Sequence, residues 1–199
     1  MSVTDIVTFM RSVLERLYPV AEAQAGLFTT AQARAAGVSR RMLTHHAASG
    51  LLERRSHGIY RLTHFPEQRF TDLVEIVLWA GPDAAISHES ALAVYDLADV
   101  MPTATNVTLP RRFRGRRSGV IVHMRELDDA DHTVRDAVRV TSVERTILDV
   151  ARDGDPDLAK RAAAEALERG LTTTSRLKRY LDSHDVRGVL PSDRARGPR

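Results

Sequence analysis

The side chains best suited to recognition chemistry lie in a short segment near the N-terminus that has the pattern of an amphipathic helix. Ser39 is a preferred N-cap residue, and Gly50 can end the helix just after residue 49. With Leu43 in a core, a period of about 100° per residue defines the opposite, exposed face. That face carries Arg41, Thr44, His45 and Ala48, with Arg40 at its edge.

These residue types are suited to DNA. Arginine can form two hydrogen bonds with O6 and N7 of guanine, and the first turn of a recognition helix is the part that approaches base edges. We therefore expect contacts with DNA from Ser39, Arg40, Arg41, Thr44 and His45. The alternative for each of them is plain solvent exposure on a surface helix.

A second basic group follows in a predicted β-hairpin. Residues 51–55 and 59–62 have the pattern of short strands, and Ser56-His57-Gly58 is typical of the turn between them. A hairpin in this position lies over the DNA backbone or the minor groove, where negative potential favours arginine. We expect Arg54, Arg55, His57 and Arg61 to contact DNA.

The densest positive segment is residues 110–119, PRRFRGRRSG. Its arginines are Arg111, Arg112, Arg114, Arg116 and Arg117. Three interpretations stay open: a second contact with the DNA backbone, which we include in the predicted site, a docking site for an acidic partner, or a solvated loop.

No pattern indicates catalysis. The chain lacks cysteine, and the adjacent His45 and His46 would project about 100° apart on a helix, which does not suit a shared metal ion. His88-Glu89 does not continue into H-E-x-x-H, and no Walker loop or G-x-S-x-G elbow is present. Neither lysine belongs to the E-x-K segment of a restriction-type nuclease. We expect no enzyme activity, no catalytic residue, no metal ligand and no cofactor; nothing points to a triad of distant residues.

The elements that position the basic residues form a winged helix. Thr29 or Thr30 can begin a short helix that ends at Gly37, and the helix after Ser39 completes a helix-turn-helix. The hairpin that follows is the wing. A further helix is expected at residues 5–18, ended by Pro19. An ordinary helical hairpin beside a β-hairpin, without nucleic acid, is the alternative.

A mixed domain follows. Strands are expected at 106–109, 120–124 and 138–140, and helices at 67–80, after Ser87, after Thr141 or Ser142, after Pro156 and near 173–183. The fold class is therefore α+β, an N-terminal winged helix-turn-helix followed by a mixed α/β C-terminal domain. We expect a DNA-binding domain at 1–65, a second domain at 66–186 and a flexible basic tail at 187–199.

Charge supports this division. Residues 1–65 contain eight arginines and four acidic residues, whereas residues 66–199 contain 21 basic and 22 acidic residues. A basic small domain joined to a neutral one indicates a module that binds a polyanion. Only two of the 29 basic residues are lysine, a preference that a GC-rich genome would also produce.

Composition indicates whether the chain is a folded, a membrane or a secreted protein. Of 199 residues, 43% are hydrophobic and 28% charged, as in folded globular proteins. No apolar run approaches the roughly 20 residues needed to span a bilayer, and the charged N-terminal segment is unlike a signal peptide. We expect a cytoplasmic protein without membrane contact.

Residues 28–62 resemble the N-terminal winged helix of AbiEi-type antitoxins of bacterial type IV toxin–antitoxin systems. The segments ISHESAL, NVTLPRRFRGRRSGVIVH and RVTSVERTILDVA look like the middle and C-terminal parts of that family, so the likeness spans about residues 20–170. The resemblance implies an autorepressor that binds double-stranded DNA at inverted repeats in its own promoter, where a dimer on the DNA is an open expectation. It also implies a C-terminal domain that counters a nucleotidyltransferase toxin, with or without touching it.

Two other functions stay open. The winged helix could contact protein rather than DNA, in a scaffold or antitoxin, or the chain could be the remnant of a nuclease-fused regulator. Salt-dependent duplex binding separates the first of these from the repressor, and metal-dependent cleavage would reveal the second.

Overall fold

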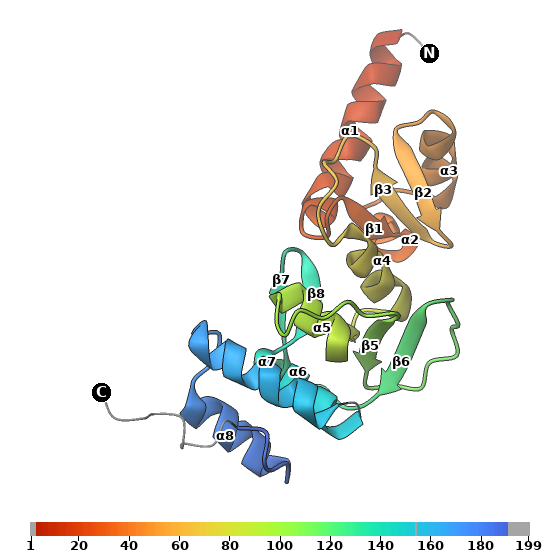
Figure 1. Ribbon diagram of the computed structural model, residues 1–199. Coiled ribbons are helices and arrows are strands. Elements are labelled where there is room, and N and C mark those ends of the chain that lie inside the picture. The colour runs from red at the N-terminus through yellow and green to blue at the C-terminus, as the bar shows by residue number, and fades with distance from the viewer. Residues whose placement is uncertain (1–2, 154, 191–199) are drawn as a thin grey trace. The chain divides into compact units, whose positions relative to one another are not determined.

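The computed structural model describes residues 3–153 and 155–190 (Figure 1). The chain forms two compact units. The first runs to Pro82 and includes Asp136–Val138, and the second comprises Asp83–Arg135 and the chain from Arg139 onward.

The first unit is a winged helix. Its helices are α1 (Val3–Glu22), α2 (Thr30–Ala35), α3 (Arg40–Ala48) and α4 (Thr71–Ala80), and its strands are β1 (Leu27–Thr29), β2 (Leu52–Ser56) and β3 (Ile59–Leu62). The strands form an antiparallel sheet in the order β1-β3-β2. The expected helix-turn-helix is α2 and α3, and the wing is the β2–β3 hairpin, which turns through Gly58 at a positive φ of 77°.

Local chemistry fixes the ends of the two helices. Thr29 Oγ1 accepts a hydrogen bond from the Gln32 amide, and Gln32 Oε1 accepts one from the Thr29 amide, a capping box that starts α2. Ser39 Oγ accepts from the Met42 amide and starts α3. Gly37, with a φ of 77°, makes the turn between the helices.

The core of this unit joins all its layers. Leu17, Phe28, Leu43 and Tyr60 are buried in it, and the rings of Phe28 and Tyr60 are stacked with centroids 6.1 Å apart. The prediction that Pro19 ends the first helix is wrong, because α1 continues to Glu22. Proline removes only one backbone hydrogen bond. Leu17 before it and Ala21 after it are both buried on the same face of the helix, and their packing holds the last turn in place.

Helix α4 extends the first unit beyond the expected boundary at residue 65. It packs against β1 and β3, and its carboxylates at Asp72 and Glu75 bind Arg55 of β2. The first compact unit therefore continues to Pro82.

In its described residues, the second unit is a five-stranded mixed sheet with four helices. Its strands are β4 (Ala85–Ile86), β5 (Thr105–Leu109), β6 (Val120–Met124), β7 (His132–Arg135) and β8 (Val138–Thr141), and its helices are α5 (His88–Tyr95), α6 (Val143–Asp153), α7 (Pro156–Glu168) and α8 (Thr174–Ser183), with a 3₁₀ turn η1 at Asp129–Asp131. The strand order is β6-β5-β4-β8-β7. The three predicted strands are present as β5, β6 and β8, and the α+β class is confirmed.

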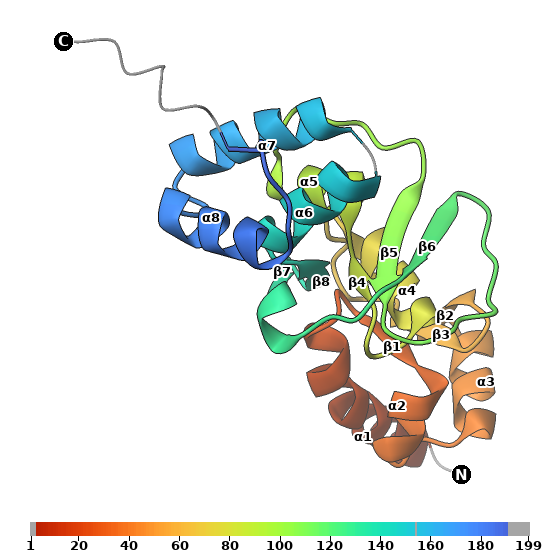
Figure 2. The same cartoon turned by 90° about the horizontal axis from the view of Figure 1, so that it is seen from below.

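Strands β5 and β6 are parallel, with Thr105 opposite Val120 and Leu109 opposite Met124. Parallel strands start at the same end, so the connecting chain must return along the full length of the pair. The arginine-rich segment is this return, seen beside β6 in Figure 2. Its arginines are therefore spread along a loop and not gathered in a tight turn.

Helix α6 is central to the second unit, contacting α5, α7 and α8 (Figure 1). It buries charged groups as well as apolar ones: Glu144, Arg145 and Asp149 are at most 5% exposed. Arg145 donates to Asp149 at 3.0 Å and to Asp131 at 2.7 Å, so these charges are paired in the interior.

Two further findings concern the ends of the chain and the membrane. Of the predicted tail at 187–199, residues 191–199 lie outside the described residues, while Val189 is buried. Among the helices described here, none is long and apolar enough to span a bilayer.

Candidate nucleic-acid interface

The exposed face of α3 has the composition predicted for it. Leu43 is fully buried, whereas Arg40, Arg41, Thr44, His45 and Ala48 are exposed. Thr44 Oγ1 donates to the Arg40 carbonyl oxygen at 3.1 Å, which fixes the hydroxyl and leaves its lone pairs outward. The helix therefore presents two guanidinium groups, a hydroxyl and an imidazole, with a small residue between them that permits close approach.

The wing completes a concave surface beside this helix. A recess of about 230 Å³ is lined by Arg40 and Thr44 of α3, by Arg54, His57, Gly58 and Tyr60 of the wing, and by Thr30. Residues from two elements that are separated in sequence thus face one space. We call Arg40, Arg41, Thr44, His45, Arg54 and His57 the α3–wing surface.

The arginines of this surface are not neutralised by carboxylates of the described residues. Arg40, Arg41 and Arg54 are exposed, and none of them forms a salt bridge with another described residue. Their charge stays available to a ligand, and five N–H donors per guanidinium suit phosphate oxygens and guanine alike.

Two predicted wing residues are placed differently. Arg55 donates to Glu75 at 3.3 Å, to Glu53 at 3.2 Å and to Asp72 at 2.9 Å. Its charge is therefore neutralised by carboxylates of its own unit. Arg61 is 8% exposed and donates to the Phe65 carbonyl oxygen. Neither guanidinium is presented with the α3–wing surface, because alternation along β2 and β3 turns both to other neighbours.

The adjacent histidines of α3 also separate. His45 is exposed, whereas His46 is 1% exposed and lies against the core side of the helix. Burial, with a smaller contribution from His45, lowers the pKa of His46 and so favours the neutral imidazole. His46 therefore belongs to the interior and not to the interface. Ser39 is exposed at the helix N-terminus.

The arginine-rich loop lies in the second unit. Arg111, Arg112, Arg114 and Arg116 are exposed, and Arg117 is half-buried. Arg111 Nε is 3.7 Å from Asp83 Oδ2.

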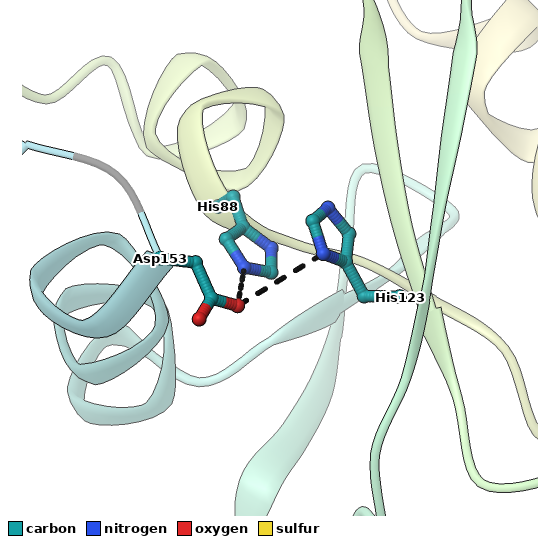
Figure 3. Close-up of side chains that lie close together, drawn as sticks. All are labelled: His88, His123 and Asp153. Carbon is teal, nitrogen blue, oxygen red and sulfur yellow. Dashed lines mark hydrogen bonds and ion pairs between the residues drawn. The ribbon is translucent and has the colours of Figure 1, made fainter.

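A second group of chemically capable side chains lies in the second unit (Figure 3). His88 starts α5, His123 lies on β6 and Asp153 ends α6. His88 Nε2 is 3.3 Å from Asp153 Oδ2, His123 Nδ1 is 4.0 Å from the same oxygen, and the two imidazoles stack with centroids 3.8 Å apart. Burial above all, with His123 second, lowers the pKa of His88 to about 4, and burial likewise lowers the pKa of His123.

Sequence reasoning missed this cluster. Metal-site motifs in a sequence have short spacings, whereas these three residues are separated by 35 and 30 positions and meet only in the folded unit. The sequence does place each of the three residues in a predicted element: His88 opens a helix, His123 lies in a strand and Asp153 ends a helix.

Comparison with known proteins supports the assignment of the first unit. The family model described as "Transcriptional regulator, AbiEi antitoxin" matches residues 15–63. This segment contains α2, α3 and the wing. The second unit lies outside the match, and no match was found among curated proteins.

Among solved structures, the chain is similar to the crystal structure of the RV2827C protein from Mycobacterium tuberculosis. The identity is 15%, the TM-score is 0.48, and the similarity covers 86% of this chain and 71% of that one. The family resemblance expected from the sequence is confirmed by the family model. Residues 15–63 of the chain are thus similar to the AbiEi antitoxin family of transcriptional regulators.

Proposed function

We propose that this protein is a sequence-specific repressor that binds double-stranded DNA at its own promoter through the α3–wing surface. The observation that carries the proposal is the set of three exposed arginines, without salt bridges to other described residues, on a winged helix of the transcriptional-regulator family. In this arrangement α3 enters the major groove and the wing follows the backbone.

The two parts of the surface have different tasks. Arg41 and His45 lie on the outer face of α3 and would contact base edges, with Ala48 allowing the helix to approach the groove floor. Arg40 and Arg54 both line the recess between helix and wing, where a backbone phosphate would lie between two guanidinium groups. Base readout gives specificity, and the phosphate contacts fix the position of the helix.

The site on the DNA is proposed to be an inverted repeat bound by two copies of the chain. A winged helix that reads one major groove covers only a few base pairs, and two copies one helical turn apart provide the length needed for a unique site. The family description also points to an antitoxin. We propose that the chain counters the effect of a nucleotidyltransferase toxin, with the second unit as the part that acts.

Competition binding to the DNA upstream of its own gene tests the repressor function. The full chain should shift a labelled upstream duplex, and a shuffled duplex of the same length and composition should compete about 10³-fold less well or worse. Footprinting should then show two protected half-sites in one inverted repeat.

Arg179→Ala is a matched control, because Arg179 is an exposed arginine on α8 of the second unit. It should leave the footprint unchanged, whereas Arg40→Ala and Arg41→Ala should weaken it. Equal competition by the shuffled duplex, or no shift at all, would refute sequence-specific repression.

The antitoxin function is tested separately by growth. Co-expression of the chain with a nucleotidyltransferase toxin encoded beside it should restore growth that the toxin alone arrests. A chain that represses the promoter but fails to restore growth would retain the regulator function and contradict the antitoxin one.

A further inference from the structure

A recess in the second unit contains a set of side chains that the repressor function does not use. It has a volume of about 590 Å³, and its polar lining includes His88, His123, Asp153, Glu89 and Arg161. The three residues His88, His123 and Asp153, here called the histidine cluster, point toward one another from α5, β6 and α6 (Figure 3).

The cluster has the dimensions of an ion site. One nitrogen from each imidazole and one carboxylate oxygen lie within 4.8 Å of one another. Neighbouring ligands of a tetrahedral ion with bonds of about 2.0 Å are about 3.3 Å apart. The distance from His88 Nε2 to Asp153 Oδ2 is already 3.3 Å, and the 4.0 Å from His123 Nδ1 must shorten by less than an ångström.

Hydrogen bonds around His123 leave its cluster-facing nitrogen unprotonated. Asn106 Nδ2 donates to Glu89 Oε2 at 3.1 Å, and a carboxylate only accepts, so this contact fixes the orientation of the amide. Asn106 Oδ1 then faces His123 Nε2 at 2.9 Å and accepts its proton. In the neutral ring the lone pair is therefore on Nδ1, directed at the cluster.

The surroundings of His88 allow the same arrangement. His88 Nδ1 is 2.9 Å from Ser87 Oγ, and Thr108 Oγ1 donates to that same oxygen. A hydroxyl can accept from Nδ1–H, which places the second lone pair on Nε2, facing Asp153. Oxygen partners on the outer ring nitrogens are the arrangement that orients histidine ligands of metal ions.

The carboxylate is held so that one oxygen stays available. Arg125 donates to Asp153 Oδ1 at 2.5 Å, and Oδ2 is the atom that faces both rings. With both histidines in this tautomer, an unprotonated nitrogen of each ring and an anionic oxygen lie within 4.8 Å of one another and repel each other. A cation there turns this repulsion into attraction.

We propose that His88 Nε2, His123 Nδ1 and Asp153 Oδ2 bind a divalent first-row transition-metal ion, of which Zn²⁺ is the probe that best suits two imidazoles and one carboxylate. Three protein ligands leave coordination positions open toward the 590 Å³ recess. The site would therefore accept water or a small anion as a further ligand, with Arg161 in the lining to favour negative charge.

A hydrolase triad is the competing interpretation of Ser87, His88 and Asp153. Ser87 is fully buried, and its hydroxyl already accepts from Thr108. A nucleophile must reach the substrate in the recess, and this oxygen does not face it. The geometry therefore favours metal binding over acyl transfer.

Calorimetry on the full chain, produced without an affinity tag and stripped with a chelator, tests the site. The wild type should bind one Zn²⁺ per chain, and Mg²⁺ should not compete at millimolar concentration. His123→Gln and Asp153→Asn should each raise the Kd for Zn²⁺ by about 10- to 100-fold or more, as expected for the loss of a ligand or its orientation. His184→Gln and His45→Gln remove imidazoles outside the cluster and should leave the Kd unchanged.

A measurement on the wild type avoids any folding defect of the variants. On addition of Zn²⁺, the imidazole ¹⁵N resonances of His88 Nε2 and His123 Nδ1 should shift together in a 1:1 titration, and those of the other histidines should not. Zn²⁺ binding that is equally lost in the control variants, or ¹⁵N shifts at other histidines in place of these two, would overturn the proposal. Absence of Zn²⁺ binding by the wild type would overturn it as well.

Discussion

Helices α3 and α6 both carry charged side chains, but the two helices use charge in opposite ways. On α3 the guanidinium groups of Arg40 and Arg41 are exposed, and neither has a salt bridge among the described residues. On α6 the charges are interior: Arg145 is 5% exposed and Asp149 is fully buried, and the two are joined by hydrogen bonds of 3.0 Å.

The difference shows where each charge finds its counter-ion. A buried ion loses its hydration and must be compensated inside the fold, as Arg145 is by Asp149, Asp131 and the Glu126 carbonyl oxygen. An exposed arginine keeps its hydration until a partner replaces it. Substitutions on α6 should therefore change stability, and substitutions on α3 should change binding.

The largest effect is expected from Arg145→Met, which keeps much of the side-chain volume but removes the charge. Asp149 and Asp131 would then be buried without their cation, at a cost of about 3–5 kcal/mol in the free energy of unfolding. Urea denaturation measures this. Lys160→Ala, which removes an exposed ion pair with Asp157, should change stability by less than about 1 kcal/mol and is the control. Similar losses in both variants would contradict the division between the helices.

Arg41→Ala should have the opposite character. Loss of a bidentate contact with guanine should weaken binding to the cognate duplex by about 1–3 kcal/mol and reduce the preference for it over random DNA. The urea midpoint should stay the same, because the side chain is exposed. A variant that loses affinity for cognate and random duplexes alike would assign Arg41 to phosphate and not to a base.

Arg54 and Arg55 are neighbouring residues of the wing that differ in the same way, because Arg54 is exposed and Arg55 is paired with carboxylates within the fold. Arg54→Ala should weaken binding to every duplex and lower the salt slope by about one, because it removes one phosphate contact. Arg55→Ala should leave both quantities unchanged and lower stability by about 1–2 kcal/mol, since buried Glu75 loses a hydrogen-bond donor. Reversed effects would show that the wing binds DNA through its other face.

Only a small effect on stability is expected in the arginine-rich loop. Arg112, Arg114 and Arg116 are exposed, so replacing all three with Ser should change the melting temperature by no more than about 2 °C. Operator affinity then separates the remaining interpretations: it falls if the loop is a second phosphate contact and survives if the loop binds an acidic partner or is only solvated. A large loss of stability would show that the loop is structural.

The winged helix could be predicted because its signals are local. Ser39, Gly37 and the alternation around His57 act within a few residues, and each determines the start of a helix, a turn or a hairpin. The exposed face of α3 follows from the helical period and the burial of Leu43.

What could not be predicted depends on contacts between distant segments. Strands β4 and β7 are too short to give a clear sequence pattern. The sequences of β5 and β6 do not indicate that these two strands pair in parallel. Arg54 and Arg55 look equivalent in sequence, but they point to opposite sides of β2, and the carboxylates of α4 meet only Arg55. The histidine cluster likewise exists only after the sheet brings β6 beside α5 and the end of α6.

The central claim is that the exposed charge of the α3–wing surface binds DNA, and the salt dependence of duplex affinity for the full chain tests it most directly. Each neutralised phosphate releases about 0.9 counter-ion, so two or more contacts from Arg40 and Arg54 predict that log K falls against log salt with a slope of about −2 or steeper. The double substitution Arg40→Ala and Arg54→Ala should reduce this slope by about two, and Arg179→Ala should leave it as in the wild type. A slope near zero, or a slope that the double substitution does not change, would contradict the account.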